Sequence, residues 1–249
     1  MLKEERFDYI LKELSKNDKV SYEMMASKLS VSEDTIRRDI EILHKNGLLS
    51  KVRGGAILRG KNPLTFHDRE NYLSGGKDII ALKAQQLIKN GQTIFMDGGT
   101  TICAIASQLP IDIQLRIITN NTALIPILSN YKDVDVIILG GTFNKTTQTT
   151  TGGQTCNEIS KYRADLHFMG ICGIHSKLGV TSVYQPDGEV KQAMQQSALK
   201  SIALSNSEKL ETSEYYRVCE LKDLYSIITD LPSNTEQLNP FRHSGVQLL

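Results

Sequence analysis

The pattern of apolar residues changes near residue 76, and this change limits the chain to a two-part α/β protein. Before that point apolar residues follow helical spacing, as Phe7, Ile10 and Leu14 do at i, i+3 and i+7. After it, short apolar runs such as 93–96 alternate with helical segments. Strands this apolar are usually buried on both faces of a mainly parallel sheet. Alternation of strands with helices indicates an α/β domain.

Three segments follow from this change. Residues 1–58 form a predicted helical head that ends in a pair of short strands. Residues 59–76 are polar, contain several glycines and Pro63, and suit a linker. Residues 77–249 form the predicted α/β domain, and a chain of 249 residues is long enough for one ordinary domain plus a small one.

Within the α/β domain the apolar runs predict six strands. A helix is expected over 79–88 and another from about Thr101, while the threonine-rich stretch 146–151 reads as a loop or a sheet edge. The predicted strands are 93–96, 116–119, 134–139, 166–171, 201–204 and 226–229.

The head has the pattern of a helix-turn-helix. A helix around 22–29 is followed by a tight connector, and Ser32 is a good N-cap for a third helix. Ile36, Ile40 and Leu43 give that helix one apolar face, and Asn46-Gly47 is expected to end it. Two short strands around a turn are predicted between Leu48 and Leu58. This geometry sets the third helix into a DNA major groove.

The charge pattern of the head also favours DNA. The chain carries 29 Lys and Arg against 28 Asp and Glu, so a net charge of +1 excludes binding by bulk positive charge. Residues 44–61 nevertheless contain no acid. The alternative is a solvated helix pair that only packs on the larger domain. The predicted DNA-binding residues, on the third helix and a basic strand pair, are Ser32, Thr35, Arg37, Arg38, Lys51 and Arg53.

The ends of three predicted strands favour a small anionic ligand. Glycines let backbone N–H groups approach an anion, threonines add hydroxyl donors, and a helix start contributes positive potential. Ligands of open α/β sheets bind at the carboxyl ends of the strands. The alternative is a plain glycine turn between strand and helix. The predicted effector-binding residues at these ends are Asp97, Gly98, Gly99, Thr100, Thr101, Thr119, Asn120, Gly140 and Gly141.

Several motifs resemble those of the DeoR family of bacterial repressors. In the head they are the run 31–40, which contains Thr-Ile-Arg-Arg-Asp, and the later Arg53-Gly54-Gly55-Ala56. In the larger domain they include the run 95–101, Ile118-Thr119-Asn120 and Glu189-Val190-Lys191. The resemblance implies a winged helix-turn-helix. It also implies an effector domain similar in fold to ribose-phosphate isomerases and CoA transferases, which senses a phosphorylated sugar.

The resemblance adds two lysines to the expected effector site. Lys191 would be a charge partner of the ligand phosphate, although a solvated helix lysine is the plainer alternative. Family members usually carry an Asp, one or two serines and a Lys after the strand near position 204. Here that stretch is Ser205-Asn206-Ser207-Glu208-Lys209, so Lys209 is a displaced equivalent and the acid is missing.

These observations predict a DNA-binding transcriptional regulator and no enzyme. It would repress carbohydrate-metabolism genes, bind double-stranded operator DNA as a homodimer or higher homo-oligomer, and be released by a phosphorylated sugar. The alternatives are a sugar-phosphate isomerase or CoA-transferase-like enzyme with an accessory DNA head, and a DNA-binding scaffold that senses nothing.

Scattered cysteines and histidines give no metal-site spacing, so neither a metal nor a cofactor is expected. The four cysteines are expected to be free and mostly buried. The N-terminus lacks the apolar core of a signal peptide, so the expected location is cytoplasmic.

Overall fold

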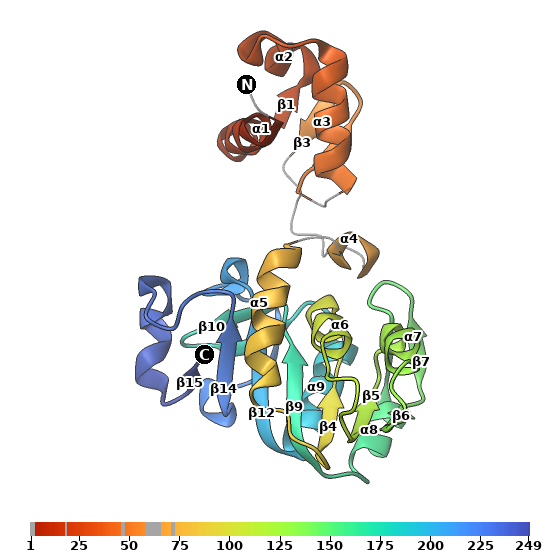
Figure 1. Cartoon of the computed structure of the whole chain (residues 1–249). Coiled ribbons are helices and arrows are strands. Elements are labelled where there is room, and N and C mark those ends of the chain that lie inside the picture. The colour runs from red at the N-terminus through yellow and green to blue at the C-terminus, as the bar shows by residue number, and fades with distance from the viewer. Residues whose placement is uncertain (1–2, 18, 46–47, 58–65, 71–72) are drawn as a thin grey trace. The chain divides into compact units, whose positions relative to one another are not determined.

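A computed structural model describes residues 3–17, 19–45, 48–57, 66–70 and 73–249. The chain divides into two compact units, Met1–Leu73 and Ser74–Leu249, and each is described by itself. Figure 1 labels most of the elements of both units. The predicted helix end at Asn46-Gly47 and half of the predicted linker, residues 59–65 and 71–72, lie outside the described residues.

The first unit contains the predicted helix-turn-helix. The side chain of Ser32 accepts a hydrogen bond from the backbone N–H of Thr35 at 3.2 Å, which confirms it as the N-cap. Ile36, Ile40 and Leu43 are fully buried in the core of this unit, as predicted. Its elements are α1 (Lys3–Asn17), β1 (Lys19–Ser21), α2 (Tyr22–Leu29), α3 (Glu33–Lys45), β2 (Ser50–Val52) and β3 (Gly55–Ile57).

The predicted strand pair is joined by a strand that the sequence did not reveal. β1 pairs with β3 and β3 pairs with β2, both antiparallel. Strand β1 has only three residues, of which Val20 alone is apolar, so the sequence shows no periodic pattern there. Gly55 lies beside this strand so closely that an added Cβ would stand 2.0 Å from the Val20 carbonyl oxygen.

A buried ion pair fixes α3 against α1. Arg6 donates to Asp39 through two nitrogens, Nε at 2.7 Å and Nη2 at 3.2 Å. The Asp39 side chain is 4% exposed and lies on the inner side of α3, next to Ile40. The acid of the Thr-Ile-Arg-Arg-Asp motif therefore positions the helix, while the two arginines before it are exposed.

The second unit is built on a seven-stranded parallel sheet with the order β15-β14-β12-β9-β4-β5-β6. All six strands predicted from apolar runs belong to it, which confirms the α/β assignment. Because the strands are parallel, their carboxyl ends meet at one edge of the sheet. The strands are β4 (Thr93–Met96), β5 (Leu115–Thr119), β6 (Val134–Ile138), β9 (Ala164–Gly170), β12 (Ala198–Ser205), β14 (Ser226–Thr229) and β15 (Gln247–Leu248).

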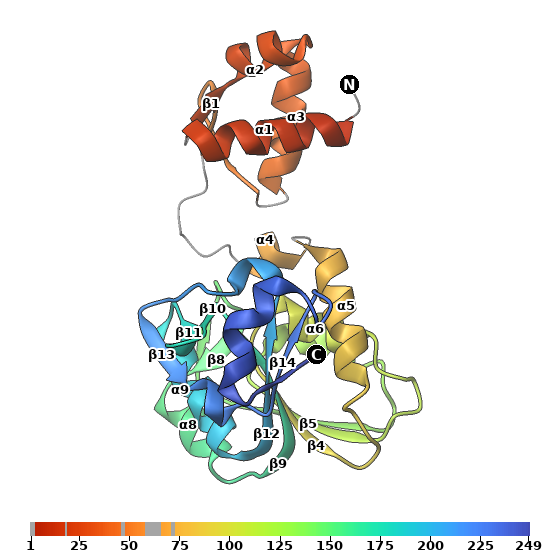
Figure 2. The ribbon, with the colours of Figure 1, turned by 90° about the vertical axis from the view of Figure 1, so that its left-hand side faces the viewer.

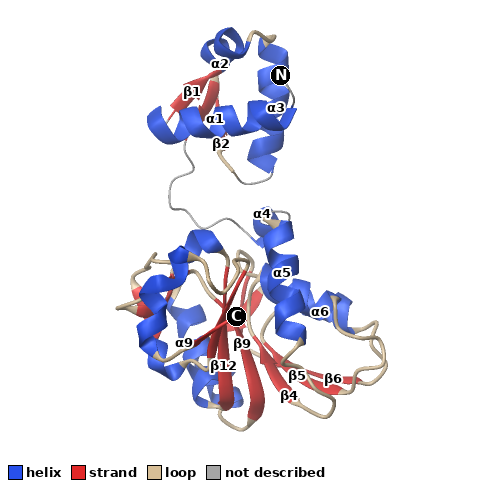
Figure 3. Cartoon of the chain, turned by 60° about the vertical axis from the view of Figure 1, so that its left-hand side comes forward, coloured by secondary structure: helices blue, strands red, loops and turns tan. Residues whose placement is uncertain are grey.

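Helices cover both faces of this sheet (Figure 3). One face packs its apolar side chains, such as Ile94 and Ile117, against α5 and α6, and the other packs Phe95 and Ile118 against α8 and α9. Figure 2 shows α8 and α9 near two small sheets. The helices are α5 (Ser74–Gln85), α6 (Thr100–Ser107), α7 (Ile125–Leu128), α8 (Gly153–Ile159) and α9 (Gln185–Gln196).

The two smaller sheets flank the main one. β10, β11 and β13 form a three-stranded antiparallel sheet, and β7 and β8 form a hairpin. Four short 3₁₀ segments complete this unit: 122–124, 207–209, 221–223 and 236–244. The small-sheet strands are β7 (Thr142–Asn144), β8 (Thr149–Thr151), β10 (Gly173–His175), β11 (Gly179–Ser182) and β13 (Tyr216–Cys219).

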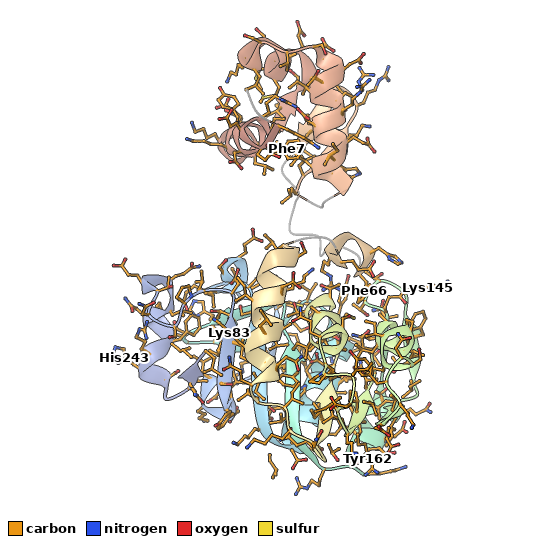
Figure 4. The ribbon with its side chains drawn as sticks, in the orientation of Figure 1. Phe7, Phe66, Lys83, Lys145, Tyr162 and His243 are labelled. Atoms are coloured by element: carbon orange, nitrogen blue, oxygen red, sulfur yellow. The ribbon has the colours of Figure 1, made fainter. Side chains whose placement is uncertain are left out.

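A lysine ties the first helix of this unit to the sheet. Lys83 of α5, labelled in Figure 4, donates to the carbonyls of Thr229 and Leu231, each at 2.7 Å. Both acceptors lie at the carboxyl end of β14. Burial lowers the pKa of Lys83, and the nearby carboxylate of Asp230 opposes that shift.

The threonine-rich stretch 146–151 consists of a turn and the edge strand β8, as expected. Three other expectations differ from the structure. The predicted linker 59–76 contains the short helix α4 (Phe66–Glu70) and the first turn of α5. Strand β6 is only partly covered, because it is an edge of the sheet, and Ile138 is 46% exposed. The four cysteines are free, but only Cys219 is buried.

No helix in the described part of the chain combines the length and apolar character needed to cross a membrane.

Replacing Gly55 with Ala tests the close approach of β1 and β3. The added methyl group would collide with the Val20 backbone, so we expect the first unit to lose about 1–3 kcal/mol of stability, as overpacking does. Gly54→Ala is the control, because its Cβ would meet no atom within 4 Å and only its positive φ of 85° is strained. Calorimetry of the full chain measures both, and equal losses would contradict the prediction.

Candidate functional site

The predicted DNA-binding residues of the first unit lie on α3 and on the strand pair after it. Arg37 and Arg38 are exposed, and Arg37 stacks over the ring of Tyr22 with its guanidinium carbon 5.2 Å from the ring centre. Arg53 is exposed in the turn between β2 and β3. Arg37, Arg53 and Lys51 line one open cleft between the helices and these strands. The arrangement matches a recognition helix with a basic wing.

Three of the predicted DNA contacts already have partners within the protein. The hydroxyls of Ser32 and Thr35 are hydrogen-bonded to each other at 2.9 Å, so they first serve the cap of α3. Lys51 forms an ion pair with Glu41 of α3, which holds the pKa of this lysine above its ordinary value. Glu41 was not among the predicted DNA-binding residues, and its pairing with Lys51 was not foreseen. DNA contacts of these six residues remain a prediction.

The second site lies at the carboxyl ends of β4, β5 and β9. β4 runs into Asp97, Gly98 and Gly99, and α6 begins at Thr100. Gly99 is the N-cap with a φ of 135°, and no side chain caps the helix. The first backbone N–H groups of α6 are therefore left without a side-chain acceptor, which is the physical basis of anion binding at helix starts.

Asp97 is the centre of this site. It is fully buried, and one oxygen accepts the backbone N–H of Gly170 at 2.7 Å, at the end of β9. Its other oxygen lies 2.9 Å from the ammonium nitrogen of Lys191 and 3.5 Å from Nε2 of His167. The carboxylate therefore joins two strands and α9.

Lys191 lies in this buried cluster and is not a solvated helix lysine. Its ammonium group contacts Asp97 and also Asp187, one turn earlier on α9, at 3.4 Å. Burial alone would lower the pKa of Lys191, but the two carboxylates outweigh burial and raise it. The amine is thus charged and already neutralised by acids of the same chain. Its contact with a ligand phosphate stays a prediction.

His167 is buried beside the same carboxylate. Burial lowers the pKa of His167, and Asp97 offsets that shift only in part, so the imidazole is neutral at pH 7. Its Nδ1 lies 3.4 Å from the hydroxyl of Ser201. Neither His167 nor Asp187 was predicted as a site residue. The spacing of Asp187 and Lys191 by one helical turn was the signal for the acid, while nothing marked the histidine.

The remaining predicted effector residues divide into two groups. Thr119 and Asn120 are buried and hold the loops together, since Thr119 donates to the Met96 carbonyl at 2.6 Å and Asn120 to the Thr150 carbonyl at 2.8 Å. Asn121, which was not predicted, donates to the carbonyls of Asp97 and Gly99. These residues shape the Asp97–Thr101 loop.

The second group is already engaged by neighbouring elements. The N–H of Gly140 donates to the carboxylate of Glu158, and Lys209 donates to the carbonyl of Ile171 at 2.7 Å. Gly141 has a φ of 144°, and an added Cβ would stand 2.1 Å from the hydroxyl oxygen of Thr155. The glycine pair is therefore required for the close packing of α8 on the end of β6.

A double-mutant cycle tests the buried ion pair. Lys191→Met leaves Asp97 and Asp187 buried without their counter-ion, so we expect a loss of about 3–5 kcal/mol in the free energy of unfolding. Adding Asp97→Asn removes one of the two charges and is expected to recover part of that loss. Urea unfolding of the single and double variants measures both terms, and strictly additive losses would show that the pair does not interact.

Comparison with known proteins assigns both units. Residues 6–61 match the model of the DeoR-like helix-turn-helix domain, and residues 74–231 match that of the DeoR C terminal sensor domain. The solved structures that resemble the chain include ribose 5-phosphate isomerase A from Methanocaldococcus jannaschii, at 15% identity, a TM-score of 0.40 and coverage of 54% of this chain and 53% of that one. The sorbitol operon regulator SorC from Klebsiella pneumoniae has 14% identity, a TM-score of 0.39 and coverage of 82% and 89%.

Curated relatives match over the full length. The transcriptional repressor GlcR of Bacillus subtilis is 32% identical over 100% of this chain and 96% of its own. The glycerol-3-phosphate regulon repressor of Escherichia coli is 28% identical over 100% and 99%. The lactose phosphotransferase system repressor of Lactococcus lactis is 29% identical over 97% and 96%. With both domain models matched in order, the chain belongs to the DeoR family of DNA-binding transcriptional regulators.

Proposed function

We propose that this regulator represses carbohydrate-metabolism genes and leaves its operator when a phosphorylated sugar binds the second unit. The main observation in favour of DNA binding is the pair of exposed arginines on α3, a capped helix next to the basic strand pair. Arginine presents a rigid fork of donors that fits guanine edges or phosphates. One such head makes few contacts, so we propose a homodimer or higher homo-oligomer on repeated half-sites.

Binding of a phosphorylated sugar is supported by hydrogen-bond donors for a phosphate at the start of α6. The hydroxyls of Thr100 and Thr101 have no hydrogen bond with any described residue, and they lie beside the uncapped start of the helix. Helix starts of this kind bind phosphate through backbone N–H groups and positive potential. We assign the effector phosphate to residues 98–101.

Acceptors for sugar hydroxyls are found at the same edge of the sheet. The amide oxygens of Asn120, after β5, and Asn206, after β12, are buried without a partner in the described part of the chain. Buried amide oxygens cost free energy unless a donor reaches them. Hydroxyl groups of a polyol are such donors. Asn206 stands in the stretch where family members usually have an acid, so a neutral acceptor replaces a charged one here.

The names of relatives favour the same class of effector. Their regulons are named for glycerol-3-phosphate and for the lactose phosphotransferase system. Repression is supported because GlcR and both of these proteins are named repressors.

An isomerase or transferase activity is less well supported. Such chemistry needs a carboxylate that is free to act as base or nucleophile. In Asp97 one oxygen accepts the Gly170 N–H and the other contacts Lys191. Both oxygens are occupied, so we propose a sensor that does not turn over its ligand. Steady conversion of a sugar phosphate by the purified protein would favour the enzyme instead.

Arg38→Ala tests the DNA half. We expect operator affinity to fall by about 10- to 100-fold, because a good arginine contact to a base is worth about 1–3 kcal/mol. The operator for this assay is a DNA fragment selected from a random pool by the wild-type protein. Arg217→Ala is the control, since it removes the same charge from an exposed side chain on β13 of the second unit. Fluorescence anisotropy measures both, and unchanged binding by Arg38→Ala would refute the assignment.

Thr100→Val with Thr101→Val tests the effector half. A thermal-shift screen of sugar phosphates first finds a ligand, which at 100 times its Kd adds about 2.7 kcal/mol of stability. The double variant removes two hydroxyls at nearly constant volume, so we expect it to lose the shift and to stay on DNA when the ligand is added. Thr93→Val, at the opposite end of β4, is the control. Normal release by the double variant would place the pocket elsewhere.

A further inference from the structure

We propose that strand β6 is the interface through which two copies of this chain join their sheets. β6 is one edge of the seven-stranded sheet, and Figure 1 shows it along one side of the second unit. It has five residues, Val-Asp-Val-Ile-Ile, whereas the opposite edge, β15, has two. Edge strands of soluble proteins are usually short, charged or covered. β6 is apolar apart from one acid.

The backbone groups that face outward from β6 can be identified from its ladder with β5. Leu115 donates to the carbonyl of Asp133, and Leu139 donates to the carbonyl of Thr119. Because N–H and C=O groups alternate sides along a strand, Asp133, Asp135, Ile137 and Leu139 face β5. The backbones of Val134, Val136 and Ile138 therefore face away from the sheet.

These outward groups have no partner within the described part of the chain. No described residue donates to or accepts from the backbone of Val134, Val136 or Ile138. A row of unpaired N–H and C=O groups is the template for adding a strand. The occupant could be an extended peptide or another copy, and we commit to the copy because the strand is complementary to itself.

The self-complementary register places Val136 opposite Val136 of the second copy. In an antiparallel pair about a two-fold axis, Val134 then lies opposite Ile138 of the second copy, and all three outward residues exchange hydrogen bonds with the partner strand. The two copies of Asp135 do not meet, since each lies opposite Ile137. Its charge is also balanced by Arg116 of β5 at 3.3 Å. The pairing therefore brings apolar side chains together and no like charges.

The surface area that the β6 pair alone would bury is smaller than that of a stable dimer interface. Specific dimers bury about 1,200–2,000 Å². Further apolar surface is available at the carboxyl end of β6, where Ile138 is 46% exposed and Phe143 of β7 is 45% exposed. In a two-fold dimer, the carboxyl end of each β6 would lie beside the amino end of β6 in the other copy. The interface proposed here thus comprises β6 and its flanking apolar side chains.

Single cysteines test the register. Val136→Cys would place two thiols on residues with Cα atoms about 5.5 Å apart, within the range of a disulfide, so oxidation is expected to cross-link the copies. Val134→Cys is the matched control, since its two copies would lie four residues apart along the pair, about 13 Å. Mixing Val134→Cys with Ile138→Cys is expected to restore the cross-link. Self-linking of Val134→Cys as fast as Val136→Cys would overturn the register.

Proline tests the hydrogen bonds. Val136→Pro removes an N–H that faces outward, a change that edge strands tolerate, so the fold should survive. We expect sedimentation to show a dimer Kd raised roughly 10- to 100-fold, with unchanged circular dichroism. Val136→Ala keeps the N–H and should weaken the dimer less. Ile137→Pro removes an N–H that faces β5 and should unfold the sheet edge instead.

The inference rests on the proposed function only in assuming a homo-oligomer, and the two can fail separately. A monomeric wild-type protein at tens of micromolar would overturn both. A wild-type dimer that Val136→Pro leaves intact, and that Val136→Cys does not cross-link, would overturn the β6 interface alone.

Discussion

The buried contact between Asp97 and Lys191 is the interaction on which the second unit depends. Both side chains are removed from water, and isolated buried charges are costly unless they are paired and hydrogen-bonded. Asp97 meets this condition through Lys191 and the Gly170 N–H, and Lys191 meets it through a second acid, Asp187. Because the partners lie on β4, β9 and α9, the pair fixes the ends of two strands and the helix above them. The glycine loop that follows Asp97 therefore starts from a rigid point.

The rigid Asp97–Lys191 cluster and the loop that follows it can therefore have different roles, although the sequence assigned both to effector binding. Lys191 and Asp97 were expected to contact the effector, which stays a prediction, and in the structure they neutralise each other. Among the described residues, none hydrogen-bonds the hydroxyls of the loop at 98–101, and none donates to the buried amide oxygens of Asn120 and Asn206 at the same edge. A buried, neutralised cluster beneath a loop with unused donors and acceptors is the arrangement expected of a preorganised pocket, in which few groups move on binding.

Prediction from sequence succeeded where a residue pattern is long or a local signal is strong. The apolar runs identified six strands of the sheet, and Ser32 before an amphipathic stretch identified the N-cap. It failed where a partner is distant in the chain. Nothing near Asp39 indicates Arg6, thirty-three positions earlier, and nothing near Asp97 indicates His167. Strand β1 was missed because three residues carry no period, and the exposure of β6 because an apolar run cannot show that its strand is an edge.

The edge position of β6 links the two proposals physically. Gly140 and Gly141 follow this strand after one residue, and the backbone of Gly140 is held by Thr155 and Glu158 of α8. Gly141 has a conformation with φ of 144°, which leaves the chain little freedom at this point. A ligand that moves this glycine pair would therefore also shift the carboxyl end of β6, one residue away. If β6 joins two copies, that change alters the dimer, and a ligand that favours one dimer geometry weakens any operator that requires the other.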